Sequence, residues 1–188
     1  QMVAKGMGLD HRIGSKFLHA GPGFGGSCFP KDLAALIQTG ERHGYPMQIA
    51  SAASRVNDVQ RERMIDKIRE AVGGLKGKTL AMLGLSFKPN TNDIREAPAL
   101  AIGRALLAEG ASIRAYDPEA LTEACQIMPE LQPCQDTYHA AEGADALVIM
   151  TEWNVFRTLD FEKLKSIMRG PMLLDLRNVY GPERVGAA

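Results

Sequence analysis

Compact apolar runs alternate with helical patterns along the chain from residue 79 onward. The runs predict buried strands at residues 79–85, 112–116, 146–150 and 172–176. The other stretches of this part predict helices at residues 97–109, 119–127, 137–142 and 161–168. Strands that alternate with helices are typical of a parallel sheet with right-handed crossovers. The alternation therefore predicts an α/β fold for this part of the chain.

The part of the chain before these runs carries a different, helical pattern. A helix is expected from Pro30, because apolar residues recur there at helical spacing, and it would end at Gly40 or Gly44. A long amphipathic helix is expected over residues 46–72. A hairpin of this length has little to bury itself against, so it should pack on the α/β part, on an upstream part or on a second copy. The expected division is into a helical segment and a Rossmann-like parallel-sheet domain, residues 1–75 and 76–188.

The composition is that of an ordinary globular protein, with 45% hydrophobic and 23% charged residues. The 22 basic and 22 acidic residues cancel, which argues against a surface for polyanions, so nucleic acid is not an expected partner. No apolar run is long enough to span a bilayer, and the first residues lack the pattern of a signal peptide. We therefore expect no association with membranes.

The three cysteines are Cys28, Cys125 and Cys134. Their number is odd, and their spacing fits neither a zinc site nor a disulfide framework. Cys125 and Cys134 lie close in sequence and could pair under oxidising conditions. The simpler interpretation is a reduced, cytoplasmic protein in which these two thiols are small apolar core residues.

Cys28 stands in a glycine-rich stretch just before a predicted helix. Glycines let backbone amides approach a ligand closely, and a helix N-terminus favours an anion such as a thiolate. Asp32 lies within the first turn after Cys28 and could hold or activate a water, while Lys31 adds a positive charge. The stretch could equally be a turn that caps the helix, with Cys28 buried and Asp32 serving only as an acid of the first turn.

Several strings along the chain resemble, in the same order, those of one known family. Residues 21–32 read GPGFGGSCFPKD, and the elements RIG and FL precede them at residues 12–14 and 17–18. The string GLSFKPNTNDIREAP follows at residues 84–98, and TEW and DLRNV come later, at residues 151–153 and 175–179. Together they resemble the active-site and C-terminal signatures of the UDP-glucose/GDP-mannose dehydrogenase family over nearly the whole chain.

The resemblance implies an oxidoreductase that converts the C6 alcohol of a sugar nucleotide to a carboxylate in two NAD-dependent steps. Cys28 would attack the intermediate aldehyde to form a thiohemiacetal, and a second hydride transfer would leave a thioester that water hydrolyses. Asp32 resembles the family's acidic partner for water and proton handling. Ser27 and the residues 29–31 are more similar to the UDP-glucose branch, with GDP-mannose or a UDP-N-acetylhexosamine as alternative substrates.

The resemblance also implies binding residues by position. The sugar-nucleotide site would be formed by Arg12, Phe17, His19, Ala20, Gly21, Pro22, Gly23, Phe87, Lys88 and Arg177. NAD would contact Cys28, Lys31 and Arg95, of which Arg95 reaches the pyrophosphate. Arg12 resembles an arginine that enters the neighbouring subunit's site, which implies a homodimer formed through the helical segment. No metal is expected.

Each of these assignments also has a plain structural alternative. Phe17 and Phe87 could be core aromatics, as most phenylalanines are. Lys88 and Arg95 could be solvated charges on an exposed loop. Arg12 could pair with a nearby carboxylate on the surface.

The chain departs from the complete family pattern in its cofactor-binding parts. The α/β part has no G-x-G-x-x-G after its first strand, so it should be the UDP-sugar-binding domain and not the main dinucleotide-binding unit. In the family, an NAD-binding domain precedes the region matched here, together with a catalytic lysine and asparagine of the central helix. These 188 residues are therefore expected to be inactive alone. A non-catalytic nucleotide-binding or dimerisation module is the alternative class.

Overall fold

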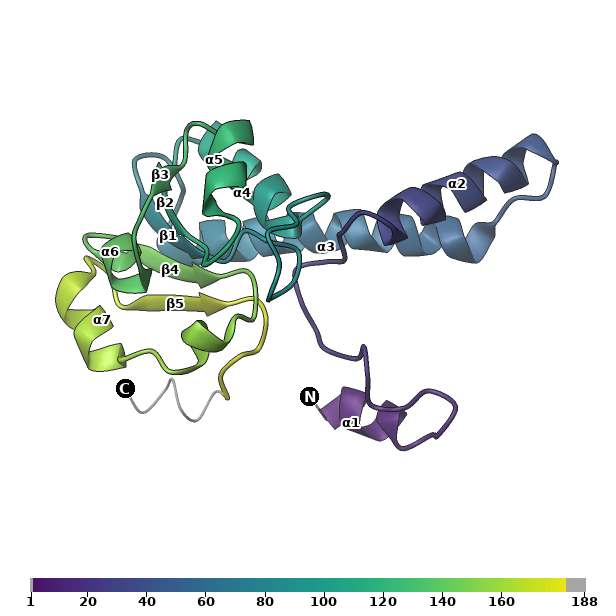
Figure 1. Ribbon diagram of the computed structural model, residues 1–188, viewed down its shortest axis with the longest axis horizontal. Helices are drawn as coiled ribbons and strands as arrows, with labels where there is room; N and C mark the ends of the chain where they lie inside the picture. Colours follow the sequence, from purple (N-terminus) through teal and green to yellow (C-terminus); the bar gives the residue numbers. More distant parts are fainter. Residues whose placement is uncertain (1, 182–188) are drawn as a thin grey trace.

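The computed structural model describes residues 2–181, which form an α/β domain with a helical arm projecting from it (Figure 1). The helices of the first part are α1 (Met2–Gly8), α2 (Phe29–Arg42) and α3 (Gln48–Val72). Pro30 lies in the first turn of α2, and a left-handed Gly73 ends α3. The two helices of the predicted hairpin are confirmed. No helix among residues 2–181, α3 included, is long and apolar enough to cross a membrane.

Five parallel strands form one sheet in the order β3-β2-β1-β4-β5. The strands are β1 (Thr79–Leu83), β2 (Ser112–Tyr116), β3 (Gln132–Pro133), β4 (Ala146–Ile149) and β5 (Met172–Asp175). All but β3 occupy the predicted runs, so the prediction of an α/β fold with a parallel sheet is confirmed. The edge strand β3 was not predicted, because so short a strand carries no periodicity.

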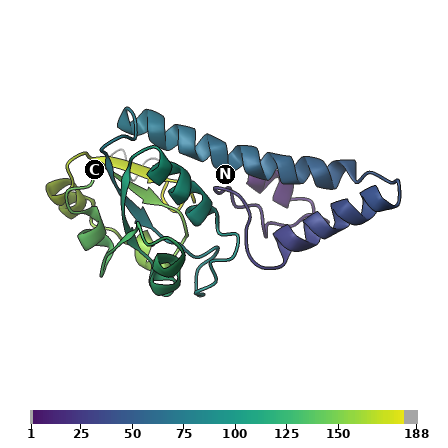
Figure 2. The ribbon, with the colours of Figure 1, turned by 90° about the horizontal axis from the view of Figure 1, so that it is seen from above.

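Helices cover both faces of the sheet (Figures 1 and 2). One core contains residues of α3, α4 (Pro98–Ala108) and α5 (Leu121–Ile127). The other contains residues of α6 (Thr137–Ala141), α7 (Phe161–Ile167) and the 3-10 helix η1 (Asn154–Arg157), which was not predicted. Side chains alternate across a strand, so Leu80 and Met82 of β1 enter the first core while Ala81 and Leu83 enter the second.

The two later cysteines lie in different cores. Cys125 packs at the edge of the core that contains α5, whereas Cys134 is buried in the core on the other face of the sheet. Burial raises the pKa of both thiols. The sheet separates them, so the alternative of a Cys125–Cys134 pair is wrong for this fold, and both act as apolar core residues.

The arm is anchored by one end of α3. Met64 and Ile68, near the C-terminus of this helix, are buried in the same core as β1 and α4. Toward its N-terminus α3 leaves the domain and packs along α2, and this part projects into solvent (Figure 2). The hairpin therefore packs on the α/β domain at one end only. Its far end leaves Ile49 88% exposed and Val56 67% exposed.

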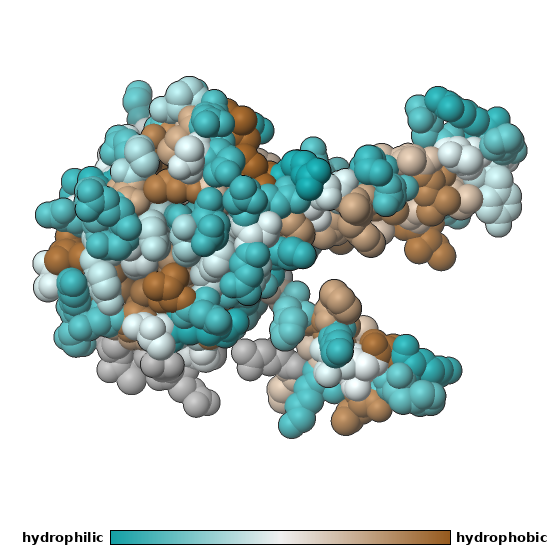
Figure 3. Space-filling view, viewed as in Figure 1, coloured by the Kyte–Doolittle hydropathy of each residue, from teal (hydrophilic) through white to brown (hydrophobic). Residues whose placement is uncertain are grey.

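The helix α1 lies apart from the arm and buries none of its side chains (Figures 1 and 3). Irregular chain joins it to α2. Its apolar residues Met2, Val3 and Met7 are exposed. Packing within the described residues therefore contributes little to holding α1 in place.

Candidate active site

The carboxyl ends of the strands carry the predicted binding residues of the α/β domain. The connections diverge between β1 and β4, and ligands bind at this position in open parallel sheets. Phe87, Lys88 and Arg95 follow β1, and Arg177 follows β5. Parallel pairing brings both groups to the same edge of the sheet, although they are far apart in sequence.

Residues 21–28 form what we call the thiol loop, and Cys28 is its last residue before α2. Gly23 and Gly26 have φ angles of 125° and 92°, which residues with side chains rarely adopt. The amide of Asp32 donates to the Cys28 carbonyl at 2.8 Å, so Asp32 belongs to the first turn of the helix. The side chain of Cys28 is exposed. This exposure rules out the alternative of a buried cysteine that only caps the helix.

Charged side chains from the first turn of α2 and from the loop between β1 and α4 lie near the thiol. Lys31 Nζ lies 2.7 Å from the Asp32 carboxylate, and this hydrogen bond raises the pKa of Lys31, with a further contribution from the Cys28 thiolate. Hydrogen bonds to Asp93 raise the pKa of Arg95, and the charge of Cys28 again contributes. An anion at Cys28 is therefore near two cations as well as the positive end of α2.

The thiol loop docks on the loop between β1 and α4. The amide of Gly26 donates to the Arg95 carbonyl at 2.9 Å. A Cβ atom on Gly25 would lie 2.2 Å from the Glu96 carbonyl oxygen, and a Cβ atom on Gly26 would lie 2.9 Å from the Phe87 ring. Only glycine permits so close an approach. The two longest family-like strings of the sequence are thus packed directly against each other.

Side chains of α3 hold the thiol loop from its other side. The Asn57 carboxamide accepts from the Phe24 amide at 2.8 Å and donates to the Phe24 carbonyl at 3.2 Å. Gln60 donates to the Gly21 carbonyl at 2.9 Å, and Arg61 donates to the Phe24 carbonyl. The sequence patterns did not predict a role for these three residues. The available signal was the polar Asn57, which shares a helical face with the apolar residues Met64 and Ile68.

A cavity of about 920 Å³ lies beside the thiol loop. This volume is in the range of small-molecule sites. Its lining includes four of the predicted substrate residues, Phe17, His19, Ala20 and Arg177. The other polar residues of the lining, which the sequence patterns did not predict, are Glu152, Arg157 and Asn178. The remaining lining residues are Val3, Ala4, Met7 and Leu18.

Arg177 is held firmly in the wall of this cavity. Its Nε donates to the Glu152 carboxylate at 2.6 Å, and the two side chains are only 16% and 26% exposed. The guanidinium also lies against the thiol loop, because a Cβ atom on Gly21 would be 2.3 Å from Nη1. Burial acts to raise the pKa of Glu152, but the hydrogen bond and charge of Arg177 outweigh it and the pKa is lowered. A charged arginine thus stands where the cavity meets the thiol loop.

Strained backbone gathers around the same site. Among the described residues with side chains, positive φ angles occur at Phe17, Asn90, Glu96 and Asn178. Phe17 has a φ of 63°, a conformation rare for a bulky residue, and its side chain is 97% exposed. Phe17 and Asn178 line the cavity, while Asn90 and Glu96 belong to the β1–α4 loop, on which the thiol loop docks. Such strain is concentrated at functional sites in proteins.

Arg12 and Arg95 both pair with nearby carboxylates. Arg12 donates to Asp10 at 3.0 Å and 2.6 Å through two guanidinium nitrogens and is not part of the cavity lining. Arg95 binds Asp93 in the same bidentate way, while its side chain remains 68% exposed. The surface pairing expected as the alternative for Arg12 is therefore present. Arg95 is paired with Asp93 in the same way, but it also lies beside the Cys28 thiol.

Phe87 and Lys88 lie beside the thiol loop at the margin of the core. Phe87 is partly buried and faces Gly26, whereas Phe17 is exposed, so the alternative of a core aromatic is wrong for Phe17. Lys88 Nζ lies 5.1 Å from the centroid of the Phe87 ring, within cation–π range. The charge of Lys88 is therefore placed above an aromatic ring that touches the thiol loop.

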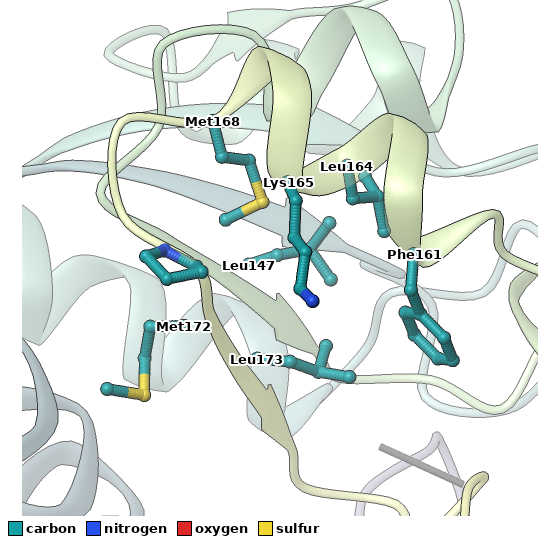
Figure 4. Close-up of a pocket in the computed structure, with 8 residues that line it drawn as sticks. Leu147, Phe161, Leu164, Lys165, Met168, Met172 and Leu173 are labelled. Carbon is teal, nitrogen blue, oxygen red and sulfur yellow. The ribbon is translucent and has the colours of Figure 1, made fainter. Parts of the chain in front are cut away.

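A second cavity, of about 60 Å³, lies between α7 and β5 (Figure 4). Apolar side chains form its wall, together with the single charged residue Lys165. It offers no paired acid, base or nucleophile and so no chemistry. Residues 2–181 also contain no group of three or more His, Cys, Asp or Glu that could hold a metal ion.

Two family descriptions match the chain, in the order of the two parts seen in the structure. Residues 1–59 match the central domain of the UDP-glucose/GDP-mannose dehydrogenase family, and residues 81–182 match its UDP binding domain. The chain belongs to the UDP-glucose/GDP-mannose dehydrogenase family. The resemblance read from the sequence is thereby confirmed, and the family is one of oxidoreductases.

Individual members of the family match almost the whole chain. A UDP-glucose 6-dehydrogenase of Rhizobium meliloti is 52% identical over 98% of this chain and 43% of its own length. The UDP-glucose 6-dehydrogenase TuaD of Bacillus subtilis is 46% identical over 99% of this chain and 41% of its own length. A UDP-glucose dehydrogenase structure from Pyrobaculum islandicum has a TM-score of 0.87 at 37% identity, over 95% of this chain and 40% of that one. The chain thus spans less than half the length of these relatives.

Proposed function

We propose that the protein containing this chain oxidises the C6 hydroxyl of UDP-glucose to a carboxylate in two steps, with Cys28 as the covalent nucleophile. The observation that carries this proposal is the docking of the thiol loop on the β1–α4 loop, where the Gly26 amide binds the Arg95 carbonyl. An exposed thiol at a helix N-terminus is thereby held at the carboxyl edge of a sheet that matches a UDP binding domain. A thiol in that position, with cations nearby, is suited to nucleophilic attack.

The proposed steps balance around the sulfur of Cys28. NAD, when bound, would accept the hydride that leaves C6 in each oxidation, and the first oxidation also releases the C6 hydroxyl proton. The Cys28 thiolate attacks the C6 aldehyde, a C–S bond forms, and the carbonyl oxygen takes up a proton to give a thiohemiacetal. Loss of hydride from C6 and of that proton leaves a thioester. Water, oriented by Asp32, then adds to the thioester carbonyl and gives up one proton to the solvent. The C–S bond breaks, which releases the carboxylic acid and the thiolate.

Positive side chains at the site suit the phosphates of substrate and cofactor. Arg177 in the cavity wall and Lys88 above the Phe87 ring are the groups we assign to the diphosphate of the sugar nucleotide. Arg95 and Lys31, beside the thiol, are the groups we assign to NAD. Phe17, His19 and the backbone of residues 20–23 would complete the substrate site.

The main binding fold for NAD is assigned to another part of the protein. The spacing G-x-G-x-x-G does occur at Gly21, Gly23 and Gly26, but irregular chain precedes it and no strand does. The glycine fingerprint binds a dinucleotide only where it joins a strand to a helix. This chain therefore supplies contacts to NAD but not the dinucleotide-binding unit, which in the family lies before the region matched here.

UDP-glucose is favoured as substrate by the relatives. The proteins that are 52% and 46% identical are both named UDP-glucose 6-dehydrogenases. A structure of a GDP-mannose dehydrogenase from Pseudomonas aeruginosa is 24% identical with a TM-score of 0.75, a likeness that shows the fold alone. GDP-mannose and UDP-N-acetylhexosamines are therefore the alternative substrates that an assay must include.

We also propose that the arm forms a homodimer. Ile49 and Val56 lie on one face of α3, seven residues apart, and both are exposed at the far end of the arm. Figure 3 shows further apolar side chains over this end of the molecule. Arg12 stands on the segment that lies apart from the arm, a place suited to entering the site of a second copy. On this proposal, residues 1–75 are part of a helical dimerisation domain.

The test of the catalytic proposal uses the full-length protein with NAD and four sugar nucleotides: UDP-glucose, UDP-galactose, UDP-N-acetylglucosamine and GDP-mannose. Two NADH per sugar, with UDP-glucose preferred, is the expected result. Cys28→Ala should lower formation of the acid by about 10³-fold or more, because the nucleophile is lost. The matched control Cys125→Ala removes a core thiol and should leave the rate near that of the wild type. One NADH per sugar, or normal acid formation by Cys28→Ala, would contradict the mechanism.

A further inference from the structure

The carboxylate of Asp117 is buried at the carboxyl end of β2 and only 2% exposed. Its Oδ2 accepts from the amides of Leu85 and Ser86, at 2.7 Å and 3.1 Å, and from the Ser86 hydroxyl at 3.1 Å. The Trp153 indole N–H lies 3.2 Å from both this oxygen and Ser86 Oγ. Its Oδ1 accepts from the amides of Glu119 and Ala120. Both oxygens of this buried carboxylate thus accept hydrogen bonds from protein donors.

Ser86 extends this network from β2 and β1 to β4. The Thr151 hydroxyl donates to the Ser86 carbonyl at 2.6 Å. A Cβ atom on Gly84 would lie 2.5 Å from Thr151 Cβ, so the two chain segments are in close contact. The carboxyl ends of β1, β2 and β4 are therefore joined at one buried point, and the chain leaves this point directly into Phe87 and Lys88.

The same loop continues to the thiol loop. The amide of Phe87 donates to the Asp93 carbonyl at 3.1 Å, which closes the loop on itself. On the far side of this loop, the Arg95 carbonyl accepts a hydrogen bond from the Gly26 amide, and the Phe87 ring faces Gly26. The buried network is thus one end of a continuous path that leads through Phe87 to the loop that carries Cys28.

We propose that Asp117 is a positioning residue of the substrate site, which holds the Ser86–Lys88 segment in the geometry that binds the sugar nucleotide. The inference rests on the proposed function, because it takes Phe87 and Lys88 as substrate contacts. A buried carboxylate that is fully hydrogen-bonded rigidifies its surroundings, and loss of one acceptor leaves buried donors unpaired. A small displacement of a binding group weakens its contacts strongly. Asp117 touches no substrate itself and acts through the segment that it holds.

The decisive substitution is Asp117→Asn in the full-length protein. Asparagine has the same shape, but one of its two ends is an NH₂ donor, and both ends of Asp117 face donors. We expect the KM for UDP-glucose and the Kd for UDP to rise about tenfold, with a smaller change in kcat. Ser86→Ala, which removes the hydroxyl alone, should raise both constants by about threefold.

Asp145→Asn is the matched control. Asp145 is also a mostly buried carboxylate of the sheet, but it serves the opposite edge, where it accepts from the Thr79 amide and pairs with Lys78 and Arg169. It should destabilise the fold without changing the Kd for UDP. If Asp117→Asn and Asp145→Asn change stability alike and neither changes the Kd, Asp117 has only a structural role.

A double substitution with Lys88→Ala separates positioning from general damage. If Asp117 acts through Lys88 and its segment, the double variant should bind UDP about as weakly as Lys88→Ala alone. Fully additive effects of the two substitutions on the free energy of UDP binding would overturn the inference.

Wild-type protein that binds UDP but oxidises no sugar would overturn only the proposed function. Wild-type protein that oxidises UDP-glucose, with a Kd for UDP unchanged by Asp117→Asn, would overturn only the role of Asp117. Failure of the wild type to bind UDP would overturn both.

Discussion

Two glycines of the thiol loop are contact residues rather than simple turn residues. Gly25 and Gly26 lie where the loop touches the Glu96 carbonyl and the Phe87 ring. The sequence could predict glycine-rich backbone next to Cys28, since that is a local property. It could not predict which backbone the glycines face, because that depends on a segment more than one helix away.

We predict that Gly25→Ala destabilises the protein by about 1–3 kcal/mol, because its Cβ would overlap a backbone carbonyl that cannot move freely. Catalytic efficiency should fall with it, since the thiol loop would be displaced. Urea unfolding and kcat/KM for UDP-glucose measure the two effects. Gly6→Ala in α1, where nothing lies within 4 Å, is the control and should cost nothing. Equal behaviour of the two variants would contradict the docking seen here.

The Glu152–Arg177 pair gives stability a dependence on pH. The pKa of Glu152 is lowered from its ordinary value of 4.5, so the unfolded chain binds its proton first as pH falls. The stabilisation from this group is complete above pH 4.5 and is lost as pH drops through the lowered value. We therefore expect the unfolding free energy of Glu152→Gln to fall less steeply below pH 4.5 than that of the wild type. Glu41→Gln, on the exposed surface of α2, is the control, and an unchanged slope in Glu152→Gln would refute the pairing.

At the scale of elements, the arm depends on one anchored end. Met64 and Ile68 belong to the α/β core, while the opposite end of α3 packs along α2. The helical periodicity and the glycine stop were sufficient to predict both helices. The direction of the arm and the exposure of Ile49 and Val56 were not predictable, since they depend on which face of α3 meets the sheet.

We predict that Ile49→Asp with Val56→Asp weakens the proposed homodimer by about 10–100-fold, because two charges would be buried at its centre. Sedimentation velocity over a concentration series measures the change. Gln48→Asp adds a charge to the same exposed end of α3, off this face, and should leave association intact. A wild-type chain that stays monomeric would contradict the proposed homodimer, and so would a double variant that associates as strongly as the wild type.

At the scale of the whole molecule, this chain contains the matched UDP binding domain and the thiol loop but spans less than half the length of its relatives. We predict that these 188 residues alone bind UDP but do not reduce NAD with UDP-glucose. Calorimetry and absorbance at the NADH band measure the two properties. NADH formed by the chain alone would show that the dinucleotide-binding unit is here after all.

Local properties of the sequence determined most of the helices and strands, the α/β class and the identity of the thiol loop. Each rests on periodicity or on a continuous string of residues. Tertiary structure alone decided the polar contacts that complete the site. Asn57 meets Phe24, Glu152 meets Arg177, and Asp117 meets Ser86, in each case across a wide gap in sequence. No local pattern encodes such pairs, because they exist only where parallel strands end together and a long helix crosses them.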